Sequence, residues 1–122
     1  MLLVEDEAQV REVTAEALRD LGYQVLEAPS GPVALQLLQQ PDRRVDILVT
    51  DVGLPGGLNG RQVADAARLS KPDLPVLFIT GYAGTVLQDR LAPGMAVIAK
   101  PFDFSILAGK VSSMLGNTVV GL

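Results

Sequence analysis

The chain has 122 residues, 48% hydrophobic and 20% charged, so it can bury a core as one domain and disorder is not expected. A net charge of -4 and only three Phe and two Tyr, with no Trp, argue against a surface that binds nucleic acid. The absence of Cys and His excludes disulfides, thiolate chemistry and imidazole ligands, so any metal must be held by oxygen atoms.

The chain opens with a predicted strand at residues 1–4 and a predicted helix at residues 7–21. Gly22 is expected to end this helix. A second strand is predicted at residues 24–27. The helical spacing places one set of apolar residues on the face expected to be buried: Val10, Val13, Ala17, Leu18 and Leu21.

The middle of the chain continues the alternation. Ser30 is predicted to cap the second helix, whose inward residues are expected to be Val33, Leu37 and Leu38. A nearly continuous apolar run at residues 45–50 is typical of a strand that is covered on both faces. The third helix is predicted at residues 60–70, with an inward face of Val63, Ala64 and Ala67.

The last part of the chain adds strands at residues 75–80 and 95–99. The short segment 84–91 between them, which opens with Gly, is predicted to be the fourth helix. The final helix is predicted at residues 103–115, and residues 116–122 form a tail. Its inward residues are expected to be Leu107, Val111, Met114 and Leu115.

Five alternations of strand and helix with short connections predict an α/β fold in which helices cover both faces of a parallel sheet. We expect a flavodoxin-like, doubly wound (βα)5 sandwich with five strands in the order 2-1-3-4-5. In such folds the functional site lies beyond the carboxyl ends of the strands. Residues 1–115 form the predicted domain.

No apolar run approaches the roughly 20 residues of a membrane-spanning helix, and no signal peptide opens the chain. We therefore expect a soluble, cytoplasmic domain without membrane contact. Because the chain begins directly on an apolar run, we also expect it to be part of a longer protein.

Polar residues stand at the ends of four predicted strands that should be neighbours in the sheet. They are Glu5, Asp6 and Glu7 after the first strand, Asp51 after the third, Thr80 at the end of the fourth and Lys100 after the fifth. Since the carboxyl ends of parallel strands meet at one edge, we expect these side chains to converge on one patch.

Such a cluster needs cations, because two carboxylates about 5 Å apart repel by roughly 3 kcal/mol at an effective dielectric of about 20. Lys100 supplies one positive charge. The remaining negative charge suggests a divalent ion on Asp6 and Asp51, with Glu5 acting directly or through water. Mg²⁺ suits this arrangement, because it takes one or two carboxylates and keeps water molecules that a phosphate oxygen can replace.

A carboxylate in this setting can accept a phosphoryl group as an acyl phosphate. The metal and the ammonium group would offset charge on the transferring group. The hydroxyl of Thr80 could then bond to the attached phosphoryl oxygens, and the added charge of about -1.5 to -2 would be the signal.

Each of these residues also has an ordinary structural explanation. The acidic residues 5–7 could merely favour the positive end of the first helix. Asp51 could be a loop aspartate, Thr80 a strand residue and Lys100 a solvated lysine. The glycines of residues 56–60 lack the G-x-x-x-x-G-K-[ST] pattern of a nucleotide site. Four polar residue types at the ends of four strands nevertheless favour a common site over coincidence.

Four segments in order closely resemble the response-regulator receiver family, and the resemblance covers nearly the whole chain. They are L-L-V-E-D-E at the start, D-I-L-V-T-D-V-G-L-P-G-G-L-N-G around Asp51, F-I-T-G-Y-A around Thr80 and A-K-P-F at Lys100. The D-V-G-L-P-G-G and G-M-A-V-I-A-K-P-F segments look most like receiver domains of hybrid sensor histidine kinases.

The resemblance implies a role for each matching position at the metal and the acceptor. Asp51 would be the phosphorylated aspartate. Asp6 would ligate Mg²⁺, Glu5 would assist, and the backbone carbonyl of Gly53 would complete the protein ligands.

The resemblance also implies how the signal would be registered. Thr80 would be the switch hydroxyl, and Lys100 would pair with the phosphoryl group. The Lys100–Pro101 bond would be cis, an isomer that proline makes inexpensive and that could aim the lysine.

Three features depart from the family pattern. Val97 stands where many members have Tyr or Phe as a rotamer switch, so we do not expect an aromatic switch in that form. Thr80 and Lys100 are closer in sequence than in many members, and the missing residues fall in the predicted helix 84–91. Gly53 and Tyr82 occupy places that tune acyl-phosphate hydrolysis in the family, and we expect Tyr82 to shield the phosphoryl group partly from water.

The implied function is phosphoryl acceptance in a two-component phosphorelay, with a histidine kinase or a histidine phosphotransfer protein as donor in trans. We do not expect an enzyme beyond phosphorylation and dephosphorylation of the domain itself. No DNA-binding output segment is present, so the effect must pass through a partner, a homodimer or a further domain.

Three other functions stay open at this point. An aspartyl-phosphate phosphatase or phosphotransferase would usually need a second acid two residues after Asp51, where Gly53 stands. A flavin-binding module shares the topology, but the chain has few aromatic residues and no Ser/Thr-rich loop after the first strand. A receiver-like scaffold that works without phosphorylation is the third.

Overall fold

The computed structural model describes residues 1–40, 44–54, 58–81 and 91–116. Five parallel strands form one sheet in the order β2-β1-β3-β4-β5. This confirms the predicted fold and strand order. In chain order the elements are β1 (Leu2–Val4), α1 (Ala8–Asp20), β2 (Leu26–Ala28), α2 (Gly31–Gln39), β3 (Leu48–Asp51), α3 (Gly60–Ser70), β4 (Val76–Thr80), β5 (Met95–Ala99) and α4 (Phe104–Met114).

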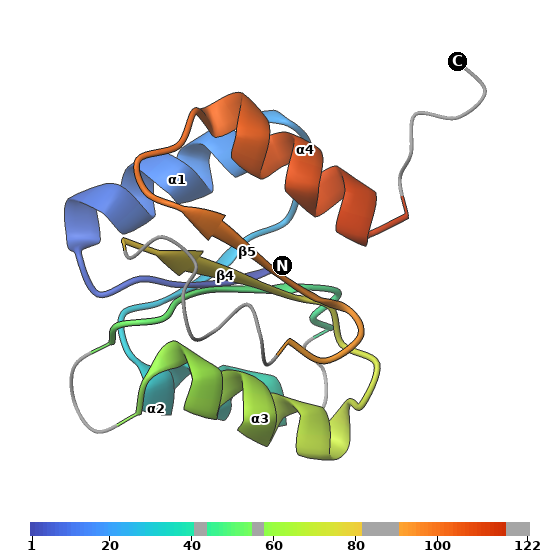
Figure 1. Cartoon of the computed structure of the whole chain (residues 1–122). Coiled ribbons are helices and arrows are strands. Elements are labelled where there is room, and N and C mark those ends of the chain that lie inside the picture. The colour runs from blue at the N-terminus through green and yellow to red at the C-terminus, as the bar shows by residue number, and fades with distance from the viewer. Residues whose placement is uncertain (41–43, 55–57, 82–90, 117–122) are drawn as a thin grey trace.

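Helices cover both faces of the sheet, α1 and α4 on one side and α2 and α3 on the other (Figure 1). Successive strand residues point to opposite faces, so each strand supplies both cores. On β1, Leu2 and Val4 join the cluster on the α2–α3 side, whereas Leu3 joins the cluster on the α1–α4 side. The continuous apolar strand sequences follow from this two-sided burial.

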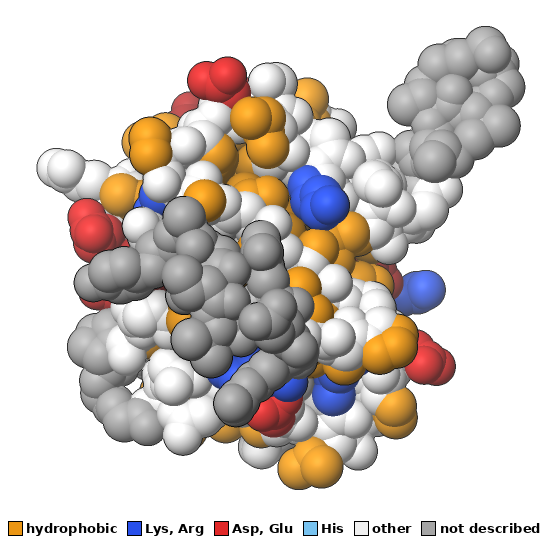
Figure 2. Space-filling view, viewed as in Figure 1, with side chains coloured by type: hydrophobic (Ala, Val, Ile, Leu, Met, Phe, Trp, Pro, Cys, Tyr) orange, Lys and Arg blue, Asp and Glu red, His pale blue; other side chains and the backbone are white. Residues whose placement is uncertain are grey.

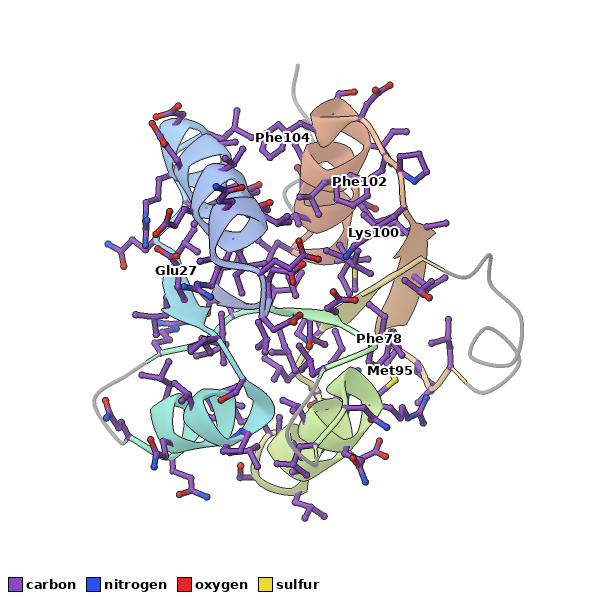
Figure 3. All side chains as sticks on the ribbon, turned by 90° about the vertical axis from the view of Figure 1, so that its left-hand side faces the viewer. Glu27, Phe78, Met95, Lys100, Phe102 and Phe104 are labelled. Atoms are coloured by element: carbon purple, nitrogen blue, oxygen red, sulfur yellow. The ribbon has the colours of Figure 1, made fainter. Side chains whose placement is uncertain are left out.

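The aromatic side chains are divided between the two cores in the same way. Phe78, in the middle of β4, is completely buried on the α2–α3 side. Phe102 and Phe104 pack at the margin of the cluster on the α1–α4 side. Figure 3 shows these two near α4, well apart from Phe78.

β1 and β4 each begin one residue later than predicted, and two other strands differ from their predicted bounds by more than one residue. β2 begins at Leu26 rather than at residue 24, because β1 offers only Leu2–Val4 for pairing and Leu2 pairs with Leu26. β3 begins at Leu48 and extends through Asp51, whose neighbour on β4 is Ile79. Asp51 is therefore the last residue of its strand rather than the first residue after it.

The predicted buried face of α1 is wrong for three of its five residues. Val10, Val13 and Leu21 are 40%, 68% and 55% exposed. The buried residues of α1 are Ala15 and Leu18. The residues of α1 that face the sheet are spaced i, i+4, i+7 and begin with a charged residue, Arg11. The apolar pattern therefore predicted a buried face that is rotated by about 100° around the helix axis from the observed one.

The starts of the other described helices fit the predictions. The Ser30 hydroxyl accepts a hydrogen bond from the backbone N–H of Val33 (3.4 Å) and caps α2. α3 spans its predicted residues and starts with a reciprocal cap between Asn59 and Gln62. α4 is one residue shorter at each end than predicted.

The predicted inward faces of these helices also hold. Val63, Ala64 and Ala67 of α3 are buried, as are Leu107 and Val111 of α4. In α2, Gly31 and Ala34 are buried, and the three predicted residues pack against the core beside them.

Residues 84–90 of the predicted fourth helix and residues 117–122 of the tail lie outside the described residues. None of the described helices is long and apolar enough to cross a membrane.

The end of β3 and the start of α3 are in very close contact. The backbone N–H of Gly60 donates to the carbonyl of Val52 (2.9 Å). A Cβ atom at Gly60 would lie only 2.1 Å from the carbonyl oxygen of Asp51. The absence of a side chain at Gly60 thus sets how closely α3 approaches the strand that ends in Asp51.

We expect Gly60→Ala to lower the free energy of unfolding by about 1–3 kcal/mol, because the added methyl group must displace the Asp51 backbone. Gly109→Ala is the matched control. Gly109 lies inside α4, is exposed and has open space at its Cβ position, so alanine should raise the unfolding free energy by about 0.5–1 kcal/mol. Urea unfolding followed by circular dichroism measures both, and a Gly60→Ala protein as stable as the wild type would contradict the argument.

Candidate functional site

The carboxyl ends of the strands bring the predicted site residues together at one edge of the sheet. Asp51 and Thr80 are the last residues of β3 and β4. Glu5 follows β1 directly, and Lys100 follows β5 directly. These four strands are consecutive neighbours in the sheet, as the predicted order required.

Three carboxylates form a cluster at this edge. Glu5, Asp6 and Asp51 each offer an oxygen atom, and these atoms lie within 4.8 Å of one another. Glu5 is only 5% exposed, Asp51 is half-buried and Asp6 is exposed. The predicted convergence of these residues is confirmed.

The cluster fits a hard cation. Its donors are oxygen atoms only, and the exposed Asp6 leaves one side accessible to water. Around Mg²⁺, with bonds of about 2.1 Å, ligand oxygens stand about 3–4 Å apart. The separations within the cluster are close to that range, so small side-chain movements would complete the geometry.

Lys100 balances part of the negative charge. Its Nζ atom donates a hydrogen bond to Oδ2 of Asp51 (3.0 Å) and lies 3.5 Å from Oε1 of Glu5. Its backbone N–H donates to the carbonyl oxygen of Thr80 (2.7 Å), which ties the ends of β4 and β5 together. In Figure 3 Lys100 lies beside Phe102, between α4 and the strands. The Lys100–Pro101 peptide bond is cis, as predicted.

Thr80 completes the predicted set. It is buried and pairs with Ala99 of β5, one residue beyond the pair formed by Asp51 and Ile79. Its backbone therefore lies between the strand that carries Asp51 and the segment that carries Lys100.

The electrostatics of the site follow from burial and charge. Burial raises the pKa of Glu5, and the neighbouring negative charge of Asp51 adds to this, although the Glu7 N–H and Lys100 act in the opposite direction. For Lys100, burial alone would favour the neutral amine. The hydrogen bond to Asp51 and the charges of Asp51 and Glu5 outweigh burial and raise the pKa of the ammonium group above its ordinary value.

The structure also tests the alternative that residues 5–7 only stabilise the start of α1. Glu7 occupies the N-cap position, but its side chain makes no capping hydrogen bond. Instead, Oε2 of Glu5 accepts a hydrogen bond from the backbone N–H of Glu7 (3.0 Å). Glu5 thus contacts the helix start and belongs to the carboxylate cluster at the same time.

The described geometry does not test the roles predicted for three further residues, Gly53, Val97 and Tyr82. Gly53 is exposed and has open space where a Cβ atom would lie, and the metal-binding role of its carbonyl stays a prediction. Val97 lies in the middle of β5, pairs with Phe78 and packs against the core on the α2–α3 side. Tyr82 lies outside the described residues.

One residue that contacts the site, Arg11, was not predicted from sequence. Nη1 of Arg11 donates a hydrogen bond to the backbone carbonyl of Glu5 (3.0 Å). Arg11 stands four and seven residues before Ala15 and Leu18 and so shares their buried face, but the apolar pattern gives no sign of this because the row begins with a charged residue.

A hollow of about 550 Å³ adjoins the site, lined by Val10 and Thr14 of α1, Glu5, Lys100 and Phe102. Figure 2 shows hydrophobic side chains reaching the surface over α1 and α4. Val13 of α1 and Ile106 of α4 are among the exposed hydrophobic residues.

Comparison with known proteins identifies the family. The family model of the response regulator receiver domain matches residues 1–112. The chain is 37% identical to the sensor kinase CckA of Brucella abortus over 117 residues, covering 94% of this chain but 12% of that kinase. It is 35% identical to the response regulator receiver protein CpdR of the same organism, covering 94% of this chain and 95% of CpdR.

Solved structures agree with these matches. A response regulator receiver protein from Sinorhizobium medicae superimposes with a TM-score of 0.87 at 31% identity, covering 94% of this chain and 92% of that chain. The receiver domain of the hybrid histidine kinase CckA gives a TM-score of 0.80 at 38% identity, covering 93% and 96%. The response regulator TrrA of Thermotoga maritima, solved in complex with Mg²⁺-BeF, gives 0.80 at 30% identity, covering 93% and 96%.

The fold, the carboxylate cluster with its lysine, and these matches lead to one conclusion. The chain belongs to the response regulator receiver domain family of two-component systems.

Proposed function

We propose that Asp51 accepts a phosphoryl group from a phosphohistidine on a partner protein, either a histidine kinase or a histidine phosphotransfer protein. One observation carries the proposal: the ammonium group of Lys100 and the carboxylates of Glu5 and Asp6 all converge on Asp51. An isolated strand-end aspartate would need no such surroundings.

Mg²⁺ is the cation we assign to the cluster. Asp6 and Asp51 would hold it, with Glu5 bound directly or through water and the carbonyl of Gly53 as a further ligand. When bound, it would offset negative charge on the phosphoryl oxygens. The description of TrrA as a complex with Mg²⁺-BeF supports this assignment.

In the transfer, an oxygen atom of the Asp51 carboxylate forms a bond to phosphorus while the bond between phosphorus and the imidazole nitrogen breaks. The partner's imidazole carries a proton on its other ring nitrogen, so it leaves as a neutral imidazole, and Asp51 becomes an acyl phosphate. Lys100 is already 3.0 Å from Asp51, so its charge can compensate the phosphoryl oxygens without a large movement.

The response would begin at the ends of β4 and β5. The hydroxyl of Thr80 would bond to a phosphoryl oxygen, and Lys100 would divide its contacts among Asp51, Glu5 and the new group. Because the Lys100 N–H is bonded to the Thr80 carbonyl, the two segments would move together. Such a change biases an existing equilibrium between two surfaces, which a partner, a second copy or a further domain then distinguishes.

Turnover of external phosphoesters is not part of the proposal. An aspartyl-phosphate enzyme of this type uses an acidic side chain two residues after the nucleophile for proton transfer, and Gly53 offers none. Hydrolysis of a generic aryl phosphate by the protein in the presence of Mg²⁺ would contradict this view.

The acceptor is tested by incubating the protein with acetyl phosphate and Mg²⁺ and measuring its intact mass. We expect the mass of one phosphoryl group to be added to the wild type and none to Asp51→Asn, which has no nucleophilic carboxylate. Asp46→Asn is the matched control. Asp46 precedes the same strand at its opposite end, so this variant should be labelled like the wild type.

The contribution of the lysine is tested by comparing Lys100→Gln with Lys110→Gln, which removes an exposed charge on α4. A charge-assisted hydrogen bond is worth about 1.5–3 kcal/mol. We therefore expect Lys100→Gln to slow acyl-phosphate formation roughly 10- to 100-fold and Lys110→Gln to leave the rate unchanged. Equal rates for the two variants would remove Lys100 from the mechanism.

Mg²⁺ should raise the unfolding temperature, since a ligand at 100 times its dissociation constant stabilises the native state by roughly 2.7 kcal/mol. Burial raises the pKa of Glu5, so Glu5 holds its proton more tightly in the folded chain than in the unfolded one. The metal-free protein should therefore lose stability as the pH rises from the ordinary Glu value of 4.5 through the raised pKa.

The same ionisation of Glu5 creates a ligand, so the gain from Mg²⁺ should grow over this pH range. Thermal unfolding at several pH values, with NaCl at equal ionic strength as the control, measures both trends. A shift in unfolding temperature that NaCl reproduces would count against a specific cation site.

A further inference from the structure

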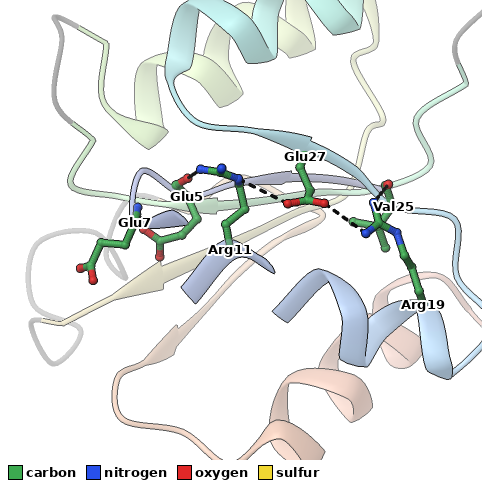
Figure 4. A network of polar contacts seen from close by, with 6 residues as sticks. All are labelled: Glu5, Glu7, Arg11, Arg19, Val25 and Glu27. Carbon is green, nitrogen blue, oxygen red and sulfur yellow. Dashed lines mark hydrogen bonds and ion pairs between the residues drawn. The ribbon is translucent and has the colours of Figure 1, made fainter. Parts of the chain in front are cut away.

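Arg11 connects the acidic turn after β1 to the edge strand β2. From the second turn of α1, its Nη1 atom donates to the backbone carbonyl of Glu5 (3.0 Å). Its Nε atom lies 3.4 Å from Oε1 of Glu27, the residue of β2 that pairs with Leu3. Figure 4 shows Arg11 between these two glutamates. The guanidinium group thus makes one contact to each of two neighbouring strand segments.

Glu27 is itself held from its other side. Its Oε2 atom accepts a hydrogen bond from Nη1 of Arg19 (3.1 Å), and Nη2 of Arg19 donates to the carbonyl of Val25 (2.6 Å). Figure 4 shows Glu27 between the two arginines. The side chains of Arg11 and Glu27 are 16% and 26% exposed, so their ion pair is shielded better than a surface pair. The carboxylate of Glu27 therefore has a defined orientation from which to hold Arg11.

These contacts fix the backbone of Glu5 on both sides. Its N–H donates to the carbonyl of Ala28 on β2 (3.1 Å), and its carbonyl accepts from Arg11. The following residue is Asp6, so the peptide group that Arg11 binds joins two carboxylates of the cluster. The position of this peptide group decides where both side chains begin.

The turn needs such a restraint because the three carboxylates of the cluster repel one another. The oxygen atoms of Glu5, Asp6 and Asp51 lie within 4.8 Å of one another, and without a cation their repulsion favours a more open turn. Lys100 contacts Asp51 and Glu5. Arg11 instead holds the backbone of the turn, where it can oppose the repulsion without taking a carboxylate oxygen from a cation.

We propose that Arg11, oriented by Glu27, is a positioning residue that holds the Glu5–Asp6 turn in the geometry that binds the divalent cation. The inference rests on the proposed function, because it assigns a role toward the same cation site. Residues that orient metal ligands commonly change metal affinity about 10- to 100-fold when they are replaced.

The chemistry of arginine suits this role. Its planar, forked group donates from separate nitrogen atoms, Nη1 to the carbonyl of Glu5 and Nε toward Glu27, whereas lysine donates from one nitrogen atom that cannot occupy both places. A lysine at position 11 should therefore keep one of the two contacts and lose the other. Neutralising Glu27 should weaken the orientation of Arg11 without touching the turn directly.

The experiment measures the Mg²⁺ dissociation constant of the unphosphorylated protein by isothermal titration calorimetry. Relative to wild type, we expect Arg11→Gln to raise it about tenfold, Glu27→Gln to raise it severalfold and Arg11→Lys to give a value between wild type and Arg11→Gln. Arg68→Gln is the matched control. Arg68 also donates to a backbone carbonyl, that of Leu74. Leu74 lies just before β4, at the amino ends of the strands and so away from the carboxylate cluster.

A second measurement separates positioning from general destabilisation. Unfolding without Mg²⁺ should show similar stability losses for Arg11→Gln and Arg68→Gln, whereas only Arg11→Gln should lose Mg²⁺ affinity. Acyl-phosphate formation by Arg11→Gln should be slow at low Mg²⁺ and return to the wild-type rate at saturating Mg²⁺. A purely structural defect would lower the rate at every concentration.

The outcomes distinguish the two proposals. If the wild type binds no Mg²⁺, the cation assignment fails and this inference fails with it. If the wild type binds Mg²⁺ and Arg11→Gln binds equally well, the role of Arg11 alone is refuted. Should Arg11→Gln not fold, Glu27→Gln decides the question, and an affinity equal to that of Arg68→Gln would overturn the inference.

Discussion

The structure depends on the balance of charge at the carboxyl ends of the strands. Three carboxylates converge there, one of them almost completely buried, and only Lys100 is in direct contact with two of them among the described residues. One ammonium group does not neutralise three carboxylates. Burial, together with the neighbouring charge of Asp51, raises the pKa of Glu5. The resting site therefore carries excess negative charge, which favours the binding of a cation.

The packing of the domain holds this unfavourable arrangement in place. On one side of the sheet, α3 reaches the carbonyl of Asp51 through Gly60, which leaves no room for a side chain. On the other side, α1 reaches the carbonyl of Glu5 through Arg11. Each acidic strand end is therefore fixed through its backbone by a helix from a different layer. The side chains remain available for ligands.

Much of this could be predicted from sequence, because strand ends are marked by local signals. Apolar runs that stop at Glu5, Asp51 and Lys100 defined both the sheet and the patch at its edge, and the observed strand order and contacts agree. The buried face of α1 could not be predicted by apolar spacing, since its row begins with Arg11, whose partner Glu27 is sixteen residues away. Contacts between charged groups on different elements leave no periodic pattern.

The short strand β2 has a consequence for how copies of the domain behave toward one another. It is an edge strand of only three residues, and it carries Glu27 at its centre. Exposed sheet edges invite pairing with a foreign strand, and brevity and charge are two ways in which proteins discourage this. The glutamate that orients Arg11 therefore also helps to protect this margin of the sheet against aggregation.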